Sequence, residues 1–301
     1  MISDIAYRIA ERMYLKEWNY NVIIRKFAML GEPTDKFILR VSTSKRSWEF
    51  FVKVCKDPKL SKYLVNEAKA LEYLNGLGMR GIPNLIIRDS YYGKEFLVQS
   101  FIHGEKVGIT NGLDIFGLAR HWLSNLYSRT QKGFVSCNDL MDKASEYVDY
   151  LSKWFDLGDI ISLMEKYLSD ESLPSVFTHG DFWFDNMIVI SKGIALVDYS
   201  LSADNQPPLD IFTLLNYMGL ENPEILASTK RLRDLTADFL RSDVDPYFLL
   251  IYNAIRRAAQ LTRLSEDLYE NLLSIDVRKI SSSARYQIGL LKNLYLKLAR
   301  Y

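Results

Sequence analysis

Cysteine and histidine are scarce in this chain of 301 residues, which contains two cysteines and three histidines. Cys55 and Cys137 are too few to form a disulfide framework, and the three histidines give no zinc-binding spacing. We therefore expect neither a disulfide-stapled scaffold nor a zinc site built from cysteine and histidine.

Excess charge and long apolar runs are also missing. The net charge is +1, which gives no general electrostatic attraction to nucleic acid or to an anionic membrane. No apolar run reaches the length of a membrane span, and the charges spread through residues 1–20 are not typical of a secretory signal. We expect a cytoplasmic protein whose partners include neither nucleic acid nor a membrane, and the sequence carries no signal of its oligomeric state.

The overall composition is that of an ordinary globular protein, with 48% hydrophobic and 25% charged residues. The length suits one large domain or two lobes, and the sequence has no internal repeat and no flexible linker.

The first third of the chain has the pattern of a small antiparallel sheet with helices. Ser3 or Asp4 can cap a first helix that ends near Trp18, because Ile5 and Ile9 repeat at helical spacing. Short β-rich runs separated by polar turns then follow. The five expected strands cover residues 22–30, 36–43, 48–55, 82–88 and 95–101.

Lys53 is unusual because it lies inside the apolar third strand. An unpaired ammonium is costly to bury, so Lys53 needs an anionic partner. Residues 58–78 form an expected helix, and Glu67 borders the apolar stripe of that helix. Glu72 is the alternative partner; the position of Glu67 nearer the middle of the helix favours Glu67.

A hairpin follows in the middle of the chain. Two apolar runs, residues 187–190 and 194–197, flank a Ser191-Lys192-Gly193 turn, which is typical of two short strands. Asn186 comes just before the first strand and Asp198 just after the second. Since the two strand ends are neighbours, we expect both polar side chains to lie close together.

His179-Gly180-Asp181 precedes this hairpin and brings a second carboxylate to the same region. An acid, an amide and a further acid suit a divalent cation beside a proton acceptor. Oxygen ligands of this kind favour Mg²⁺, and Mg²⁺ favours phosphates.

The spacing of His179-Gly180-Asp181, Asn186 and Asp198 resembles the catalytic loop and metal-binding segment of the aminoglycoside phosphotransferase and choline kinase group, which shares the protein-kinase-like fold. The resemblance implies an α+β, two-lobed fold. Residues 1–102 would be the nucleotide-binding lobe, with a five-stranded antiparallel sheet and one main helix. Residues 103–301 would be a larger, mostly helical lobe for catalysis and substrate binding, with the hinge near His103.

The resemblance also implies roles for the central residues. Asp181 would accept or orient the proton of a substrate hydroxyl, and His179 would brace the loop. Asn186 and Asp198 would hold Mg²⁺ against the phosphates of ATP. Asp210, at the expected start of a helix, can cap that helix, hydrogen-bond the backbone of the catalytic loop, or do both.

Further residues follow from the same resemblance in the first lobe. Lys53, fixed by Glu67, would neutralise phosphate charge. The backbone from Gln99 to Phe101 would bind adenine. Phe51 lies on the same strand face as Lys53 and either packs against adenine or is an ordinary core residue.

One feature of the sequence departs from protein kinases. The first turn, residues 30–35, has a single glycine, whereas phosphate-cradling loops of protein kinases carry several. The sequence therefore assigns no phosphate contact to this turn.

The activity implied is an ATP- and Mg²⁺-dependent transfer of the γ-phosphoryl group to a hydroxyl of a small molecule. A protein kinase is the first alternative, but the chain has no His-Arg-Asp, Asp-Phe-Gly or Ala-Pro-Glu motif. An inactive nucleotide-binding scaffold is the second alternative, which would have no need to keep all of Lys53, Asp181, Asn186 and Asp198.

The acceptor is expected to be neutral or anionic and sugar-like. Residues 204–301 contain 12 acidic and 13 basic residues, so they show no acidic excess for a polycationic aminoglycoside. Arg256, Arg257 and Arg263 add positive charge on one expected helix, where most of it can be solvated.

Overall fold

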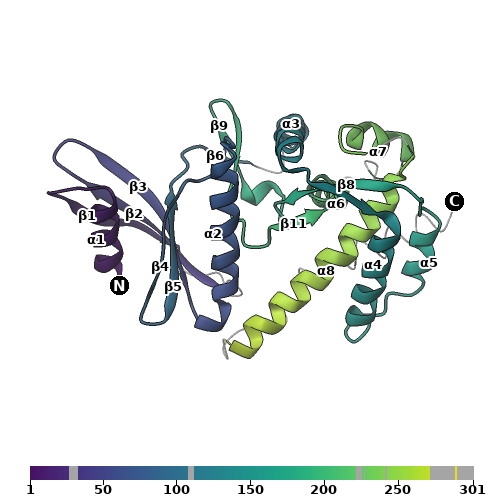
Figure 1. Ribbon diagram of the computed structural model, residues 1–301, viewed down its shortest axis with the longest axis horizontal. Coiled ribbons are helices and arrows are strands. Elements are labelled where there is room, and N and C mark those ends of the chain that lie inside the picture. Colours follow the sequence, from purple (N-terminus) through teal and green to yellow (C-terminus); the bar gives the residue numbers. More distant parts are fainter. Residues whose placement is uncertain are drawn as a thin grey trace. The chain divides into compact units, whose positions relative to one another are not determined.

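The computed structural model describes residues 1–26, 33–107, 112–221, 226, 228–240, 243–271 and 289 (Figure 1). It consists of two compact units. Unit 1 holds Met1–Glu105, Ile188–Leu201 and, from Asp267, the end of the last described helix; unit 2 holds Lys106–Met187 and Ser202–Glu266. The expected assignment of nucleotide binding to residues 1–102 and of catalysis to residues 103–301 stays a prediction. Among the described helices, none has both the length and the apolar composition to cross a membrane.

Unit 1 is built on an antiparallel sheet of five strands in the order β1-β2-β3-β5-β4, so the predicted five-stranded sheet is confirmed. The strands are rich in aromatic and β-branched residues, which point alternately to the two faces of the sheet, so each face can pack against a helix. The strands are β1 (Asn19–Lys26), β2 (Thr34–Ser42), β3 (Ser47–Cys55), β4 (Leu85–Tyr91) and β5 (Lys94–Ser100).

Two helices cover the two faces of this sheet. Helix α1 (Ile2–Arg12) packs Ile5 and Ile9 against the face that carries Val52 and Val54 of β3. Helix α2 (Ser61–Gly76) contacts β3, β4 and β5 from the other face, toward which Lys53 points. Figure 1 shows α1 and α2 with the strands β4 and β5 between them. An apolar core therefore lies under α1, and the charged side chain of Lys53 lies under α2, beside the buried apolar residues of that helix.

Helix α1 is shorter than the sequence predicts. It was expected to reach Trp18 but ends at Arg12, because Tyr14 adopts a left-handed backbone conformation with φ 55°. The amide of Tyr14 donates to the Glu11 carbonyl at 3.0 Å and that of Leu15 to the Ala10 carbonyl at 2.9 Å. These two bonds form a Schellman motif, a helix end that usually has glycine or asparagine where this chain has tyrosine.

The expected central hairpin is present as β9 (Met187–Ile190) and β10 (Gly193–Leu196). A two-residue strand, β6 (Glu105–Lys106), extends it to three strands in the order β10-β9-β6. Gly104 just before β6 lies so close to β9 that a Cβ there would be 2.2 Å from the Val189 carbonyl oxygen. Only glycine fits at this position, and the close approach fixes the chain beside the hairpin that leads to Asp198.

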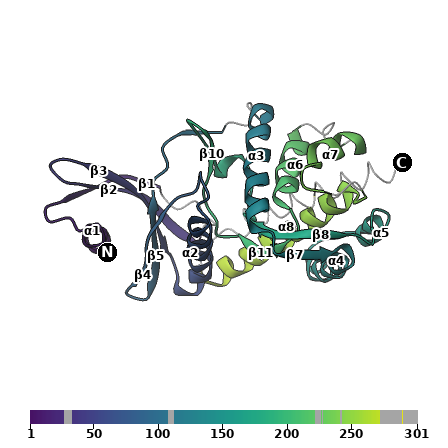
Figure 2. The same cartoon turned by 45° about the horizontal axis from the view of Figure 1, so that its top comes forward.

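Unit 2 is mostly helical, as predicted, and also contains a three-stranded sheet in the order β11-β8-β7 (Figure 2). The strands β7 (Gly133–Ser136) and β11 (Ala203–Gln206) were not expected, because each has only four residues and β11 is polar. The remaining elements are α3 (Gly112–Thr130), α4 (Cys137–Leu151), α5 (Ile160–Glu165), β8 (Ser172–Thr178), α6 (Asp210–Glu221), α7 (Thr229–Thr236) and α8 (Pro246–Asn271).

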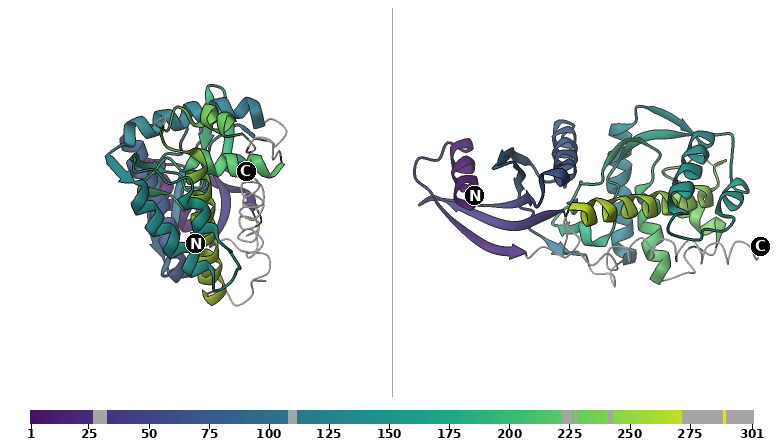
Figure 3. Two further views of the ribbon diagram at one scale, coloured as in Figure 1. Left: turned by 90° about the vertical axis from the view of Figure 1, so that its right-hand side faces the viewer. Right: turned by 90° about the horizontal axis from the view of Figure 1, so that it is seen from below.

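The core of unit 2 gathers around the first half of α8, drawn in yellow-green in Figure 3. Its residues 247–252 are all buried, and so are residues 211–215 of α6. These two helices hold polar side chains between them as well: the Asn253 amide of α8 donates to the Thr213 hydroxyl of α6 at 3.1 Å. Arg257, four residues further along α8, is buried as well.

Candidate active site

A fully buried ion pair lies in unit 1 between β3 and α2. Lys53 Nζ donates to both carboxylate oxygens of Glu67, at 2.8 and 2.7 Å. Lys53 is 2% exposed and Glu67 is not exposed at all. Each charge therefore has the partner that burial demands, and the pair fixes the ammonium in place.

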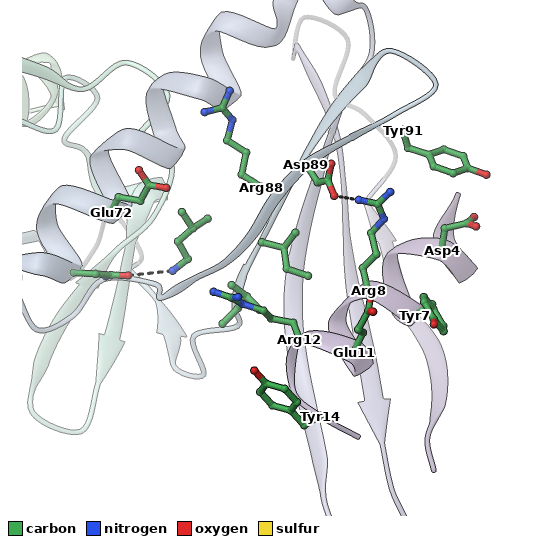
Figure 4. Close-up of a pocket in the computed structure, with 14 residues that line it drawn as sticks. Asp4, Tyr7, Arg8, Glu11, Arg12, Tyr14, Glu72, Arg88, Asp89 and Tyr91 are labelled. Atoms are coloured by element: carbon green, nitrogen blue, oxygen red, sulfur yellow. Dashed lines mark hydrogen bonds and ion pairs between the residues drawn. The ribbon is translucent and has the colours of Figure 1, made fainter. Parts of the chain in front are cut away.

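Glu72, the alternative partner of Lys53, lies on the exposed part of α2 and is not part of this ion pair. It lines a pocket of about 1100 Å³ along the edge strand β4, together with residues of α1 (Figure 4). The pocket contains charges of both signs, including the ion pair between Arg8 and Asp89. None of the catalytic, nucleotide-binding or metal-binding residues expected from the sequence lies among its lining residues.

Asp198 receives hydrogen bonds from two lysines. Lys53 Nζ lies 3.0 Å from Asp198 Oδ1, and Lys36 Nζ lies 3.0 Å from Asp198 Oδ2. The Ser200 hydroxyl also donates to Asp198 Oδ1 at 3.0 Å. Asp198 has a left-handed backbone with φ 68°, and its side chain is 24% exposed. The carboxylate is thus bound on one side and accessible on the other.

The charges of this cluster set the pKa values of its acids. Burial acts to raise the pKa of Asp198, but Lys53 and Lys36 outweigh it and hold that pKa well below its ordinary value. Burial raises the pKa of Glu67, although Lys53 opposes the rise. Asp198 is therefore a carboxylate at neutral pH, as a ligand for a divalent cation must be.

Unit 2 contains the His179-Gly180-Asp181 loop, which follows directly on β8. Gly180 has φ 79°, a conformation that glycine adopts without strain. Asp210, fully buried at the start of α6, accepts hydrogen bonds from the amides of His179 and Gly180 at 2.8 and 3.0 Å. Of the roles left open for Asp210, the structure shows the contact with the loop backbone. Burial raises the pKa of Asp210, and His179 and both amides oppose that rise.

His179 is buried and acts inside the loop rather than at its surface. Its Nδ1 accepts a hydrogen bond from the amide of Asp181 at 3.3 Å, and its ring meets Phe182 edge to face. This geometry suits a residue that braces the loop.

Asp181 is held by two side chains. Asn186 Nδ2 donates to Asp181 Oδ2 and to its carbonyl oxygen, both at 2.9 Å. Arg257 of α8 forms an ion pair with Asp181 Oδ1, and its Nη1 donates to the Gly180 carbonyl oxygen at 2.5 Å. Both bonds from Asn186 use its amide nitrogen, so its Oδ1 takes part in neither of them.

Arg257 corrects an expectation from the sequence. We expected most of the charge of Arg256, Arg257 and Arg263 to be solvated, but Arg257 is 1% exposed and Arg256 is 6% exposed. Burial acts to lower the pKa of Arg257, and Asp181 and Tyr217 outweigh it. Arg263 alone is exposed, stacked over Tyr150 at 4.8 Å. The apolar sequence on both sides of Arg257 was the signal that this part of the helix is buried.

The residues expected around adenine lie on, or directly after, the neighbouring interior strands β3 and β5 of unit 1. Phe51 pairs with Gln99 in the β3–β5 register, on the same face as Lys53. Gln99 is buried, and its Oε1 has no hydrogen-bonding partner among the described residues. The Phe101 amide donates to the Glu49 carbonyl at 3.1 Å. Adenine binding by these residues stays a prediction.

No group of three or more His, Cys, Asp or Glu side chains in the described ranges is arranged to hold a metal ion. Asn186 in unit 2 and Asp198 in unit 1 each carry an oxygen of the kind that Mg²⁺ prefers, and Mg²⁺ in proteins commonly takes one or two such ligands with phosphate oxygens and water as the others. The chemistry of each side chain fits Mg²⁺, and their joint binding of one ion stays a prediction. Residues 30–32 of the glycine-poor turn lie outside the described residues.

The sequence matches the phosphotransferase enzyme family over residues 36–243. No curated protein matches the chain.

Solved structures share the fold over nearly the whole chain. A choline/ethanolamine kinase family protein from Mesorhizobium loti has a TM-score of 0.60 at 18% identity, covering 99% of this chain and 98% of its own. Choline kinase from Cryptosporidium parvum Iowa II has a TM-score of 0.58 at 15% identity, covering 99% and 97%. The GDP complex of aminoglycoside 2'-phosphotransferase-IIIa has a TM-score of 0.59 at 14% identity, covering 97% and 98%. At these identities the likeness shows the fold alone.

The Asp181–Arg257 pair leads to a prediction about stability. The Arg257 side chain is 2% exposed, so Asp181→Ala leaves a buried cation without its counter-charge. We expect the free energy of unfolding, measured in urea, to fall by about 3–5 kcal/mol.

Asp185→Ala is the matched control, because Asp185 lies exposed on the same loop, and its effect should stay within about 0.5 kcal/mol. Adding Arg257→Met to Asp181→Ala should recover part of the loss, since no charge is then left unpaired. Equal effects of Asp181→Ala and Asp185→Ala would show that Arg257 does not depend on Asp181.

Proposed function

The chain belongs to the phosphotransferase enzyme family, and we propose that it transfers the γ-phosphoryl group of ATP, with Mg²⁺, to a hydroxyl of a small molecule. The observation that carries this proposal is the buried Lys53–Glu67 pair, whose ammonium also donates to Asp198 at 3.0 Å. A lysine fixed by a helix glutamate beside an acidic metal ligand is the arrangement with which kinases bind nucleotide phosphates.

Unit 1 would bind the nucleotide. Lys53 would neutralise phosphate charge, and Asp198 would hold the metal ion, for which the sequence predicts Asn186 as the second ligand. Bound Mg²⁺ would supply charge neutralisation at the β- and γ-phosphates. Adenine would lie near Phe51 and the backbone from Gln99 to Phe101, and the unpartnered Oε1 of Gln99 supports a ligand there.

Unit 2 would supply the group that handles the proton. Asp181 would accept or orient the proton of the acceptor hydroxyl. Its carboxylate is fixed by Asn186 and Arg257, and the loop backbone is fixed by Asp210. A base held in this way needs little reorganisation when the hydroxyl arrives.

We infer a neutral or anionic, sugar-like acceptor. The nearly equal numbers of acidic and basic residues in 204–301 support this acceptor class. The positive charge of Arg257 does not add to that support, because Asp181 neutralises it. Beside the loop, Trp183 stacks on Tyr217 with ring centroids 5.0 Å apart, and both rings are partly exposed. Aromatic surfaces with a few polar groups are typical of small-molecule sites.

The division of labour between the acids gives a prediction. Asp181→Asn should cut turnover by roughly 10²–10⁴-fold, the usual range for a positioned acid or base, with nucleotide affinity nearly unchanged. Asp198→Asn should weaken Mg-ATP binding as well as turnover, because it removes a metal ligand. Calorimetric titration with Mg-ATP and steady-state kinetics of both variants measure the two effects.

Glu72→Gln serves as the control, since Glu72 is exposed on α2 and makes no contact with Lys53. Equal nucleotide affinity in the two aspartate variants would refute the assignment of base and metal ligand. Binding of Mg-ATP without any turnover on a broad metabolite pool would instead identify a nucleotide-binding scaffold.

The acceptor class gives a further prediction. Steady-state assays should show ATP-dependent phosphorylation of a member of a sugar panel and none of kanamycin-type compounds. Efficient phosphorylation of an aminoglycoside, with kcat/KM above about 10⁴ M⁻¹s⁻¹, would overturn the acceptor class and leave the nucleotide assignment intact.

Trp183→Ala tests the aromatic pair within the same assay. We expect the KM for the acceptor to rise about two- to tenfold with the KM for ATP unchanged, because stacking contributes on the order of 0.5–1.5 kcal/mol. The matched control is Trp154→Ala, since Trp154 is 60% exposed and lies on the surface of the same unit.

A further inference from the structure

Lys36 is a charged residue of unit 1 to which the sequence analysis assigned no role. It lies on β2 directly opposite Lys53 of β3 in the antiparallel register, so the two side chains leave the same face of the sheet. Its side chain is 13% exposed. Two lysines in opposite positions repel each other unless anions lie between them, so their placement requires a negative group on this face.

Asp198 supplies that group in the structure. Lys53 Nζ and Lys36 Nζ lie 3.0 Å from Oδ1 and Oδ2 of its carboxylate, one lysine on each oxygen. The two lysines differ in their second contacts, because Lys53 is also clamped by both oxygens of Glu67. Glu67 would therefore still hold Lys53 if Asp198 bound a metal ion. Lys36, by contrast, donates to Asp198 Oδ2, so it would compete with a metal ion for that oxygen.

The bound nucleotide would bring a replacement anion. Mg-ATP carries a net negative charge on its phosphates, so a metal ion on Asp198 arrives together with oxygens that an ammonium can bind. In the sequence, Lys36 also follows residues 30–35, where a turn was expected and a single glycine is present; the structure places Thr34 and Asp35 in β2. A loop with few glycines brings fewer backbone N–H groups close to a phosphate. A lysine nearby in the sequence can bind the phosphate in place of those groups.

We propose that Lys36 is a second phosphate-binding lysine, which moves from Asp198 to the nucleotide phosphates when Asp198 takes up the metal ion. The proposal rests on the proposed function, because it requires a nucleotide. The competing explanation is that Lys36 is only a counter-ion that keeps Asp198 ionised.

Nucleotide affinity separates the two explanations. In calorimetric titrations Lys36→Met should weaken the binding of Mg-ATP about ten- to a hundredfold, the range for one charge-assisted hydrogen bond, and leave the binding of adenosine unchanged. Lys36→Arg keeps the charge and should stay within a few-fold of the wild type. Should Lys36→Met fail to fold, Lys36→Gln takes its place, with the same expected loss.

Lys45→Met is the matched control, because Lys45 is exposed in the turn of the same β2–β3 hairpin, and its nucleotide affinity should equal that of the wild type. Wild-type affinity for Mg-ATP in folded Lys36→Met, with a lower urea midpoint, would overturn this proposal and leave the proposed function standing. A wild-type protein that binds no nucleotide would overturn both.

Discussion

The buried ion pair between Lys53 and Glu67 is the constraint on which the charge cluster of unit 1, formed by Lys53, Glu67, Lys36 and Asp198, depends. Two charges with so little exposure persist only when they are paired, and removal of one partner of such a pair typically costs about 3–5 kcal/mol. The pair fixes the helix α2 against the strand β3 and aims the remaining hydrogen of the ammonium at Asp198. A second contact, from the Asn66 amide to the Ser200 carbonyl at 2.9 Å, ties the same helix to the chain after β10.

Unit 2 uses the same physical device for its loop. Asp210 and Arg257 are both buried, and they bind opposite kinds of polar group on the loop. Asp210 accepts hydrogen bonds from two backbone amides, and Arg257 donates to a carbonyl oxygen and a carboxylate. The loop already buries Phe182 and Phe184, and these two charged neighbours fix its polar backbone groups as well. In each unit, a buried charged side chain orients a carboxylate that stays partly exposed: Lys53 orients Asp198 in unit 1, and Arg257 orients Asp181 in unit 2.

Local patterns predicted much of this arrangement. The five strands and the central hairpin follow from short apolar runs between turns, and Glu67 follows from its place beside the apolar stripe of its helix. The end of α1 could not be predicted, because a tyrosine adopts the left-handed conformation that glycine usually supplies. Lys36 and Arg257 were missed for a different reason: their partners, Asp198 and Asp181, lie far away in sequence, and only the register of β2 and β3 or the burial of α8 brings them together.

The central claim is that the charge cluster of unit 1 binds the phosphates of a nucleotide, and the melting temperature at increasing Mg-ATP tests it most directly. At about a hundred times its Kd, Mg-ATP should add about 2.7 kcal/mol of stability. For a chain of this length that is a shift of several degrees, on the order of 2–4 °C per kcal/mol, and adenosine at equal concentration should give a smaller one. No shift at millimolar Mg-ATP in a folded protein would contradict the account.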